Sequence, residues 1–234
     1  MRIALVGYGK MGKMIEQLAH SRSMEVAARF DIDDPLQNDR KTRERLEGVD
    51  TLIEFSTPEH VLENIEIGLA LGKQLVIGTT GWHQHLKSIQ IQVETAGTGL
   101  VYASNFSLGV NLFYEIASFA GRILSRFDAY DPYIEEAHHR FKKDAPSGTA
   151  LVIKECIQEF YSRDIPVTSV RAGYIPGTHS VNFDSRADSI QLSHTARNRE
   201  GFAEGALLAA EWIVNRQGCY NFRDVLKTIL EGKI

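Results

Sequence analysis

The first 105 residues alternate short apolar runs with stretches that have the periodicity of an amphipathic helix. Residues 10–20 form one such stretch and residues 57–71 another, with Thr57 and Pro58 as the expected cap and first turn of the second. Strand and helix in alternation favour a parallel sheet that carries helices on both faces. The predicted strands are residues 3–6, 25–30, 51–55, 74–77 and 99–103.

The pattern changes after residue 105. Helices are expected at residues 110–125 and 149–161 on either side of a strand at 130–137. Consecutive strands then follow between residues 169 and 195, which is typical of an antiparallel sheet, and an alanine-rich helix is predicted at 202–215. The predicted fold is α/β. It has a parallel-sheet domain of residues 1–105 and 206–234, an α+β domain of residues 106–205, and a hinge between them.

Charge and composition limit the partners of the chain. The formal net charge is −4, and no long basic run is present, so neither nucleic acid nor a membrane surface is an expected partner. An anionic ligand would have to be bound by a local cluster. No apolar stretch reaches about 18 residues, and the amino terminus lacks the apolar core of a signal peptide. Cys156 and Cys219 have no metal-type spacing, and we expect reduced thiols in a cytoplasmic protein.

A glycine-rich turn, GYGKMG, follows the first predicted strand. Gly7, Gly9 and Gly12 have the G-x-G-x-x-G spacing. The first glycine permits a tight turn, the second lets a pyrophosphate approach the backbone, and the third lets helix and strand pack closely. The amino terminus of the following helix offers free N–H groups to phosphate oxygens. The turn predicts a Rossmann-type dinucleotide site; the alternative is a glycine turn that binds no nucleotide.

The choice of cofactor depends on Asp31, at the end of the second predicted strand, because a carboxylate there can accept from a ribose hydroxyl. Its neighbour is Ile32 rather than arginine, which favours NADH over NADPH, although Lys10 and Lys13 could help to bind a phosphate. The loops after the fourth and fifth strands either contact the same ligand or are only turns. The expected cofactor-binding residues are Gly7, Tyr8, Gly9, Lys10, Met11, Gly12, Asp31, Gly78, Thr79, Thr80, Ala103, Ser104, Asn105 and Phe106.

Residues 135–150 read EEAHHRFKKDAPSGTA and allow three interpretations. A solvated charged loop is the ordinary one. A metal site is not expected, because adjacent histidines on a strand point to opposite faces and no further ligand motif is present. The third interpretation is an anion site with an acid. Backbone N–H groups at the helix start after Pro146 can hold a carboxylate, Lys142 adds positive charge, and a histidine of ordinary pKa can donate a proton near neutral pH.

The same segment resembles the signature of the dihydrodipicolinate reductase family, now described as 4-hydroxy-tetrahydrodipicolinate reductases. That signature, E-A-H-H-x-x-K-x-D-A-P-S-G-T-A, matches residues 136–150 throughout. Further matches follow in the family's order: GTTG at 78–81, ASNFSLGVN at 103–111, VRAG at 170–173, His179 and the late GALLAAEWI.

The resemblance implies NAD(P)H-dependent reduction of a cyclic dicarboxylate, 4-hydroxy-tetrahydrodipicolinate, in lysine and diaminopimelate biosynthesis. It implies that His138 is the general acid and that Lys142 holds the substrate and assists the reaction. His139, Gly148 and Thr149 would bind the substrate carboxylates, and the chain would form a homotetramer through the sheet of its second domain. Two alternatives share the glycine turn: another NAD-dependent amino-acid or semialdehyde dehydrogenase, and a non-catalytic dinucleotide sensor.

Overall fold

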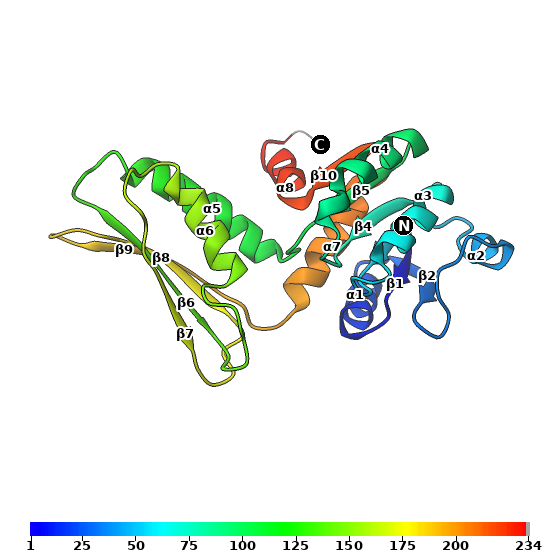
Figure 1. Cartoon of the computed structure of the whole chain (residues 1–234), viewed down its shortest axis with the longest axis horizontal. Helices are drawn as coiled ribbons and strands as arrows, with labels where there is room; N and C mark the ends of the chain where they lie inside the picture. Colours follow the sequence, from blue (N-terminus) through cyan, green and yellow to red (C-terminus); the bar gives the residue numbers. More distant parts are fainter. Residues whose placement is uncertain (233–234) are drawn as a thin grey trace. The chain divides into compact units, whose positions relative to one another are not determined.

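The computed structural model describes residues 1–232 and divides into two compact units (Figure 1). The first unit contains Met1–Leu108 and the segment that starts at Glu200; the second is Gly109–Arg199. The boundaries predicted from the sequence are residues 105 and 206. The second boundary falls earlier because helix α7 (Glu200–Ile213) contacts α1 and three strands of the first sheet.

The first unit is built on a six-stranded sheet in which every neighbouring pair is parallel. The order is β10-β5-β4-β3-β1-β2, so the five predicted strands are confirmed and a sixth, β10, comes from the C-terminal segment. Periodicity missed β10 because it is only four residues long, GCYN, and is only half-buried. The strands are β1 (Arg2–Val6), β2 (Glu25–Phe30), β3 (Thr51–Glu54), β4 (Gln74–Ile77), β5 (Gly99–Tyr102) and β10 (Gly218–Asn221).

The helices of the first unit are α1 (Lys10–Ser21), α2 (Arg40–Arg45), α3 (Val61–Ala70), η1 (His83–His85), α4 (Leu86–Ala96), α7 and α8 (Phe222–Leu230). The prediction that Thr57 and Pro58 cap α3 is wrong. The carbonyl of Thr57 accepts from the N–H groups of His60 and Val61, both at 3.1 Å, so a separate turn precedes the helix. α2 was not predicted because its sequence, RKTRER, has no apolar stripe.

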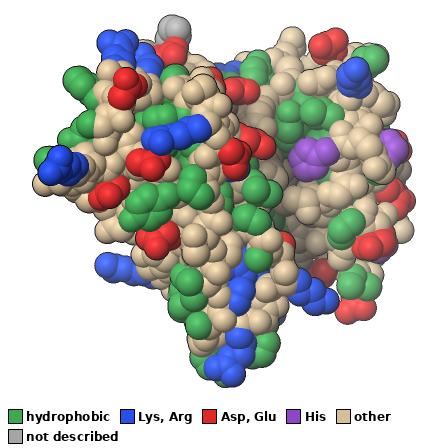
Figure 2. Space-filling view, turned by 60° about the vertical axis from the view of Figure 1, so that its left-hand side comes forward, with side chains coloured by type: hydrophobic (Ala, Val, Ile, Leu, Met, Phe, Trp, Pro, Cys, Tyr) green, Lys and Arg blue, Asp and Glu red, His purple; other side chains and the backbone are tan. Residues whose placement is uncertain are grey.

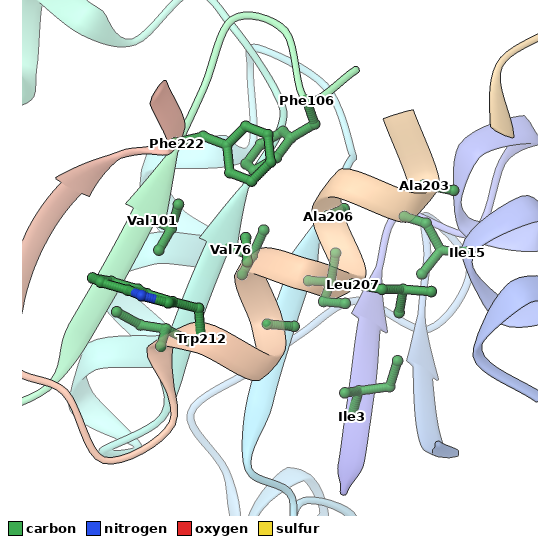
Figure 3. Packing of buried hydrophobic residues seen from close by; sticks show 14 of the residues in the cluster. Ile3, Ile15, Val76, Val101, Phe106, Ala203, Ala206, Leu207, Trp212 and Phe222 are labelled. Atoms are coloured by element: carbon green, nitrogen blue, oxygen red, sulfur yellow. The ribbon is translucent and has the colours of Figure 1, made fainter. Parts of the chain in front are cut away.

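Each face of the first sheet carries its own core. Alternation along β1 sends Ile3 and Leu5 to one face and Ala4 and Val6 to the other. On the first face the strands pack against α1, α7 and α8, and Figure 3 shows side chains of β1, β4 and β5 meeting Leu207 and Trp212 of α7. On the second face they pack against α3 and α4. The predicted parallel sheet with helices on both faces is therefore confirmed.

The second unit has a four-stranded sheet in the order β7-β6-β8-β9. The expectation of an antiparallel sheet is only partly correct, because β6 and β7 pair in parallel while β6–β8 and β8–β9 are antiparallel. The crossover helix α6 between β6 and β7 accounts for the parallel pair. The elements are α5 (Leu108–Leu124), β6 (Asp131–His138), α6 (Gly148–Gln158), β7 (Val167–Arg171), β8 (Thr178–Asp184) and β9 (Ser189–Thr195).

Helices α5 and α6 cover one face of this sheet, where Phe113 and Ile153 pack with Ile134, Val181 and Phe183. The opposite face is mostly polar. It presents alternate positions of the strands, among them the polar Thr168, Glu135, Asn182, Gln191 and Ser193 and the apolar Ala137 and Val170.

Residues 1–232 also bear on the state of the two cysteines and on membrane-spanning helices. Neither Cys156, which is buried, nor Cys219, which is half-buried, forms a disulfide within this range. Within this range, no helix combines the length and the apolar character that crossing a bilayer requires.

Candidate active site

A row of polar side chains crosses the helix-covered face of the second sheet. Glu136 and His138 are two residues apart on β6 and therefore point to the same face. Strand pairing adds Arg171 of β7 opposite His138, and His179 of β8 opposite Glu136. His194 of β9 is in turn opposite His179. Four strands thus bring a carboxylate, three imidazoles and a guanidinium into one row.

Glu136 is the centre of this row and is only 2% exposed. Arg171 Nη2 donates to its Oε1 at 2.6 Å, and the backbone N–H of Ser147 donates to the same oxygen at 3.3 Å. Oε2 bonds to Nδ1 of His138. Burial alone raises the pKa of the Glu136 carboxyl, but the hydrogen bonds from Arg171 and His138 outweigh it and bring that pKa to about 2. The group is a carboxylate at neutral pH.

His138 is the last residue of β6 and is 8% exposed. Burial lowers its pKa below the ordinary value, and only part of this is offset by the Glu136 carboxylate. Its ring meets the ring of His179 edge-on, with centroids 5.0 Å apart. A Cβ at position 177 would lie 3.0 Å from Nε2, so glycine at that position leaves the outer nitrogen uncrowded.

His179 links the row to the start of α6. Its Nε2 lies 3.2 Å from Oγ of Ser147, which also caps α6 by accepting from the N–H of Ala150. Burial and the neighbouring His138 lower the pKa of His179 to about 4. His179 is therefore neutral under ordinary conditions and does not compete with His138 for a proton.

The remaining residues predicted to bind substrate lie where β6 ends and α6 begins. Lys142 pairs with Asp144 at 2.9 Å in the loop after His139, and Gly148 and Thr149 are the first residues of α6. No side chain or backbone atom lies within 4 Å of the position that a Cβ of Gly148 would take. Figure 2 shows Lys and Arg side chains gathered at the lower end of the molecule, where β6 and β7 end in Figure 1. The start of α6 and the positively charged loop before it can together bind an anion.

Donor atoms of Glu136, His138 and His179 lie within 4.8 Å of one another, which is close enough for a metal ion. The charges argue against one. Glu136 is already neutralised by Arg171, and Lys142 adds a second cation that acts on both histidines. The same donors are better explained as a proton-handling group.

The glycine turn of the first unit has the backbone that a dinucleotide site needs. Gly7 has φ +89°, and a Cβ there would lie 2.4 Å from the carbonyl oxygen of Phe55. A Cβ at Gly12 would lie 2.4 Å from the carbonyl oxygen of Gly7, so the third glycine permits close packing. Gly9, the N-cap of α1, has nothing within 4 Å of its Cβ position. The open position is the one where a pyrophosphate would approach.

A cavity of about 590 Å³ opens beside this turn. It is lined by Gly7, Gly9 and Asp31 of the predicted set, and also by residues of the loop after β3, including Phe55, Ser56 and His60. A ribose hydroxyl in this cavity would be within reach of the Asp31 carboxylate. The volume of the cavity and the acceptor that Asp31 provides are therefore compatible with the adenosine half of a dinucleotide.

A buried carboxyl group supports the loop after β3. Glu54 is 2% exposed, and its Oε1 accepts from the N–H of Ser56 at 3.0 Å and from Asn64 of α3 at 3.3 Å. Burial raises the pKa of this carboxyl. Glu54 therefore ties the wall of the cavity to the end of β3 and to α3.

Other predicted cofactor residues do not line this cavity. Gly78–Thr80 and Ala103–Phe106 follow β4 and β5, the next strands in the sheet. The ring of Phe106 is a core residue that packs on Phe222, with centroids 4.9 Å apart, so only its backbone is left for a ligand. The side chain of Tyr8 bonds to Glu16 along α1.

Two signals in the sequence identify some of the site residues for which no role is predicted above, which are Glu136, Arg171, Gly177, Ser56 and His60. Glu136 precedes His138 by two positions on a predicted strand, which places both on one face. Ser56 and His60 follow the third strand, whose carboxyl end meets the same edge as those of its neighbours. Nothing in the local sequence marks Arg171 or Gly177 as neighbours of His138.

Comparison with known proteins identifies relatives over the whole chain. The family described as "Dihydrodipicolinate reductase, N-terminus" matches residues 1–106, and "Dihydrodipicolinate reductase, C-terminus" matches residues 109–226. A 4-hydroxy-tetrahydrodipicolinate reductase of Christiangramia forsetii is 35% identical, over 99% of this chain and 100% of the relative. The enzyme of that name from Cupriavidus necator is 34% identical, over 97% and 99%. The resemblance seen in residues 136–150 is confirmed.

Comparison with solved structures leads to the same family. A dipicolinate-bound dihydrodipicolinate reductase from a Paenisporosarcina species superimposes with a TM-score of 0.80 at 26% identity, covering 96% of this chain and 99% of that one. An amine dehydrogenase from Mycobacterium smegmatis has a TM-score of 0.58 at 8% identity, over 96% and 95% of the two chains, and shares the fold alone.

Proposed function

This chain belongs to the dihydrodipicolinate reductase family, and from that membership we infer its reaction and the roles of its site residues. It is an NAD(P)H-dependent 4-hydroxy-tetrahydrodipicolinate reductase of lysine and diaminopimelate biosynthesis. The reaction consumes one NAD(P)H and one proton and releases the hydroxyl group of the substrate as water. One observation carries the assignment of roles: a buried histidine, paired with a carboxylate, stands beside a cationic loop and a helix start.

A bound nicotinamide would supply the hydride for this reduction. His138 gives the proton to the carbon next to the one that receives the hydride, as the general acid. Its outer nitrogen, Nε2, faces Gly177, which leaves that atom uncrowded, while its inner nitrogen is held by Glu136. The neutral His179 beside it keeps a second positive charge out of the pocket.

Lys142 binds the dicarboxylate substrate and offsets charge during protonation. In the free protein its ammonium group is paired with Asp144, which is exposed, so exchanging that partner for a substrate carboxylate carries a small cost. His139 and the N–H groups of Gly148 and Thr149 take the carboxylates at the start of α6. The dipicolinate reported with the Paenisporosarcina relative is a small dicarboxylate of this class.

The cofactor is NADH in preference to NADPH. The carboxylate of Asp31 lines the cavity together with that of Glu63, and the neighbouring Ile32 is apolar. A 2′-phosphate would bring two further negative charges to these carboxylates, whereas a ribose hydroxyl can donate to Asp31. Gly7, Tyr8, Gly9, Lys10, Met11 and Gly12 hold the pyrophosphate, and the loops Gly78–Thr80 and Ala103–Phe106 extend the site along the sheet edge.

We further infer a cytoplasmic homotetramer formed through the second sheet. No helix among residues 109–199 covers the face that carries Thr168, Asn182 and Ser193, and this mostly polar face also exposes the apolar side chain of Val170. Such a face can pair with a copy of itself by side-chain hydrogen bonds. Light scattering after size exclusion should give four times the chain mass, and Ser193→Arg should lower it. A monomeric wild type would contradict the assembly.

The enzymatic assignment is tested by following oxidation of NADH and of NADPH while the substrate is made in place from pyruvate and aspartate semialdehyde by the upstream synthase. Oxidation should depend on both precursors, and the two kcat/KM values rank the cofactors. A protein that binds NADH but oxidises neither nucleotide would be the non-catalytic sensor. Oxidation with another amino acid or semialdehyde alone would favour the dehydrogenase alternative.

A further inference from the structure

Glu136, which bonds to the inner nitrogen of His138, is buried in the second unit and only 2% exposed. A buried carboxylate needs partners, because an unpaired one carries a large desolvation penalty. Three groups from different segments supply them: Arg171 of β7, the N–H of Ser147 before α6, and His138 on the same strand. The fold therefore brings three hydrogen-bond donors to this one carboxylate.

The contact with His138 determines which ring nitrogen carries a proton. An ionised carboxylate can only accept hydrogen bonds. Arg171 keeps Glu136 ionised, so Nδ1 of His138 has to be the donor in the bond between them. A neutral His138 then has its lone pair on Nε2, and protonation places the transferable proton on that atom. The outer nitrogen is thus the only one that can exchange a proton with a ligand.

The surroundings of Nε2 are consistent with proton transfer from this atom to a ligand. Gly177 leaves the space next to Nε2 free of side-chain atoms, since a Cβ there would come within 3.0 Å. Arg171 donates to the carbonyl of Asp144 at 2.6 Å as well as to Glu136. One guanidinium therefore connects the partner of the acid to the loop that carries Lys142.

We propose that Glu136 is a positioning residue of the reaction: it fixes the tautomer and orientation of His138, stabilises the protonated ring, and is itself held by Arg171 and Ser147. The proposal rests on the role of His138 as the general acid. Glu136 does not touch the substrate, so its removal should impair proton transfer and leave the binding of both ligands nearly unchanged.

The test compares Glu136→Gln with Glu155→Gln. Glu155 is exposed on α6, seven residues beyond Gly148, and belongs neither to the polar row nor to the uncovered sheet face. Glutamine keeps the shape of the side chain but removes the charge, so it can present an N–H to Nδ1 and favour the wrong tautomer. In Glu136→Gln we expect kcat to fall at least tenfold, but by less than the loss of about 10²–10⁴ that follows when the general acid itself is removed. KM for the substrate and the Kd for NADH should change little.

A pH profile separates positioning from a purely structural role. The charged or titratable groups that face His138 are Glu136 on its own strand, Arg171 on β7, His179 on β8 and Lys142 in the loop. Removing the only negative one should move the alkaline limb of kcat/KM to lower pH. In Glu155→Gln both kcat and the profile should match the wild type. A Glu136→Gln enzyme with wild-type kcat and an unshifted limb would overturn the proposal.

A third variant distinguishes failure of this inference from failure of the underlying mechanism. If His138→Ala is inactive while Glu136→Gln is normal, only the positioning role is wrong. If both variants are normal, His138 is not the acid. Should Glu136→Gln fail to fold, nitrogen NMR of the wild-type histidines at neutral pH decides the question. A neutral His138 protonated on Nδ1 supports the proposal, and one protonated on Nε2 overturns it.

Discussion

His138 and Arg171 are register partners at the ends of the parallel strands β6 and β7, and both side chains bond to the carboxylate of Glu136. Strand pairing therefore sets the position of the acid and of the countercharge for its partner. Groups that are carried on strands are held more accurately than groups on loops, and proton transfer depends on that accuracy. The substrate-binding groups, by contrast, lie on the loop after β6 and at the start of α6.

His138→Ala should reduce kcat by about 10²–10⁴, because the proton must then come from water. The Kd for NADH should stay within about twofold, since the glycine turn belongs to the other compact unit. Steady-state kinetics and NADH fluorescence titration measure the two quantities. His139→Ala is a useful comparison: it should raise the substrate KM more than it lowers kcat. A His138→Ala enzyme with unchanged kcat would exclude this histidine as the acid.

Lys142→Ala should damage both kcat and KM. A hydrogen bond to a charged group contributes about 1.5–3 kcal/mol, which corresponds to about 10- to 150-fold in KM. The loss in kcat should be at least tenfold, because the cation also offsets charge in the transition state. Lys143→Ala is the matched control, since Lys143 is exposed and adjacent, and its kinetics should remain close to the wild type. Equal effects of the two substitutions would mean that the loop contributes only general positive charge.

The pH dependence should differ between kcat/KM and kcat. A general acid works only while it is protonated, so activity is lost as the pH rises through the pKa of His138. Burial lowers that pKa in the free enzyme, below the ordinary value of about 6.5. A bound dicarboxylate brings negative charge beside Lys142 and should raise the pKa of His138 again. The alkaline limb of kcat should therefore lie at higher pH than that of kcat/KM, and coincident limbs would contradict this coupling.

Asp31→Ala should shift the cofactor preference toward NADPH. Losing a charge-assisted hydrogen bond to the ribose should raise the KM for NADH about tenfold or more, while a 2′-phosphate no longer meets the carboxylate. Asp33→Ala is the control, because Asp33 is exposed and does not line the cavity. The ratio of the two kcat/KM values is the measurement. An unchanged ratio in Asp31→Ala would place the discrimination elsewhere.

Gly205→Ala should destabilise the first unit, although alanine is the better helix former by about 1 kcal/mol. A Cβ at position 205 of α7 would lie 1.9 Å from the carbonyl oxygen of Phe106, so the helix would have to move away from the chain after β5. Overpacking of this kind costs about 1–3 kcal/mol. Gly201→Ala in the same helix meets only Ser107 Oγ at 3.4 Å and should be neutral or stabilising. Urea unfolding of both variants compares them; equal stabilities would contradict the steric argument.

The sequence by itself determined the features that depend on local patterns. Apolar runs predicted five strands of the first sheet, and the glycine spacing predicted the turn before α1, because periodicity and backbone freedom are properties of neighbouring residues. The signature in residues 136–150 likewise pointed to His138 and Lys142. Local patterns failed where the local signal was weak, as at β10, or where a turn preceded a helix, as at Thr57.

Only the tertiary structure decided what surrounds His138. Arg171 lies 35 residues beyond Glu136 in the chain, and it reaches the carboxylate because α6 carries the chain back to form β7 beside β6. Gly177 and His179 arrive through the turn into β8 and its antiparallel pairing with β6. The pairing of strands, and so the identity of these neighbours, depends on the packing of the whole unit rather than on any local spacing.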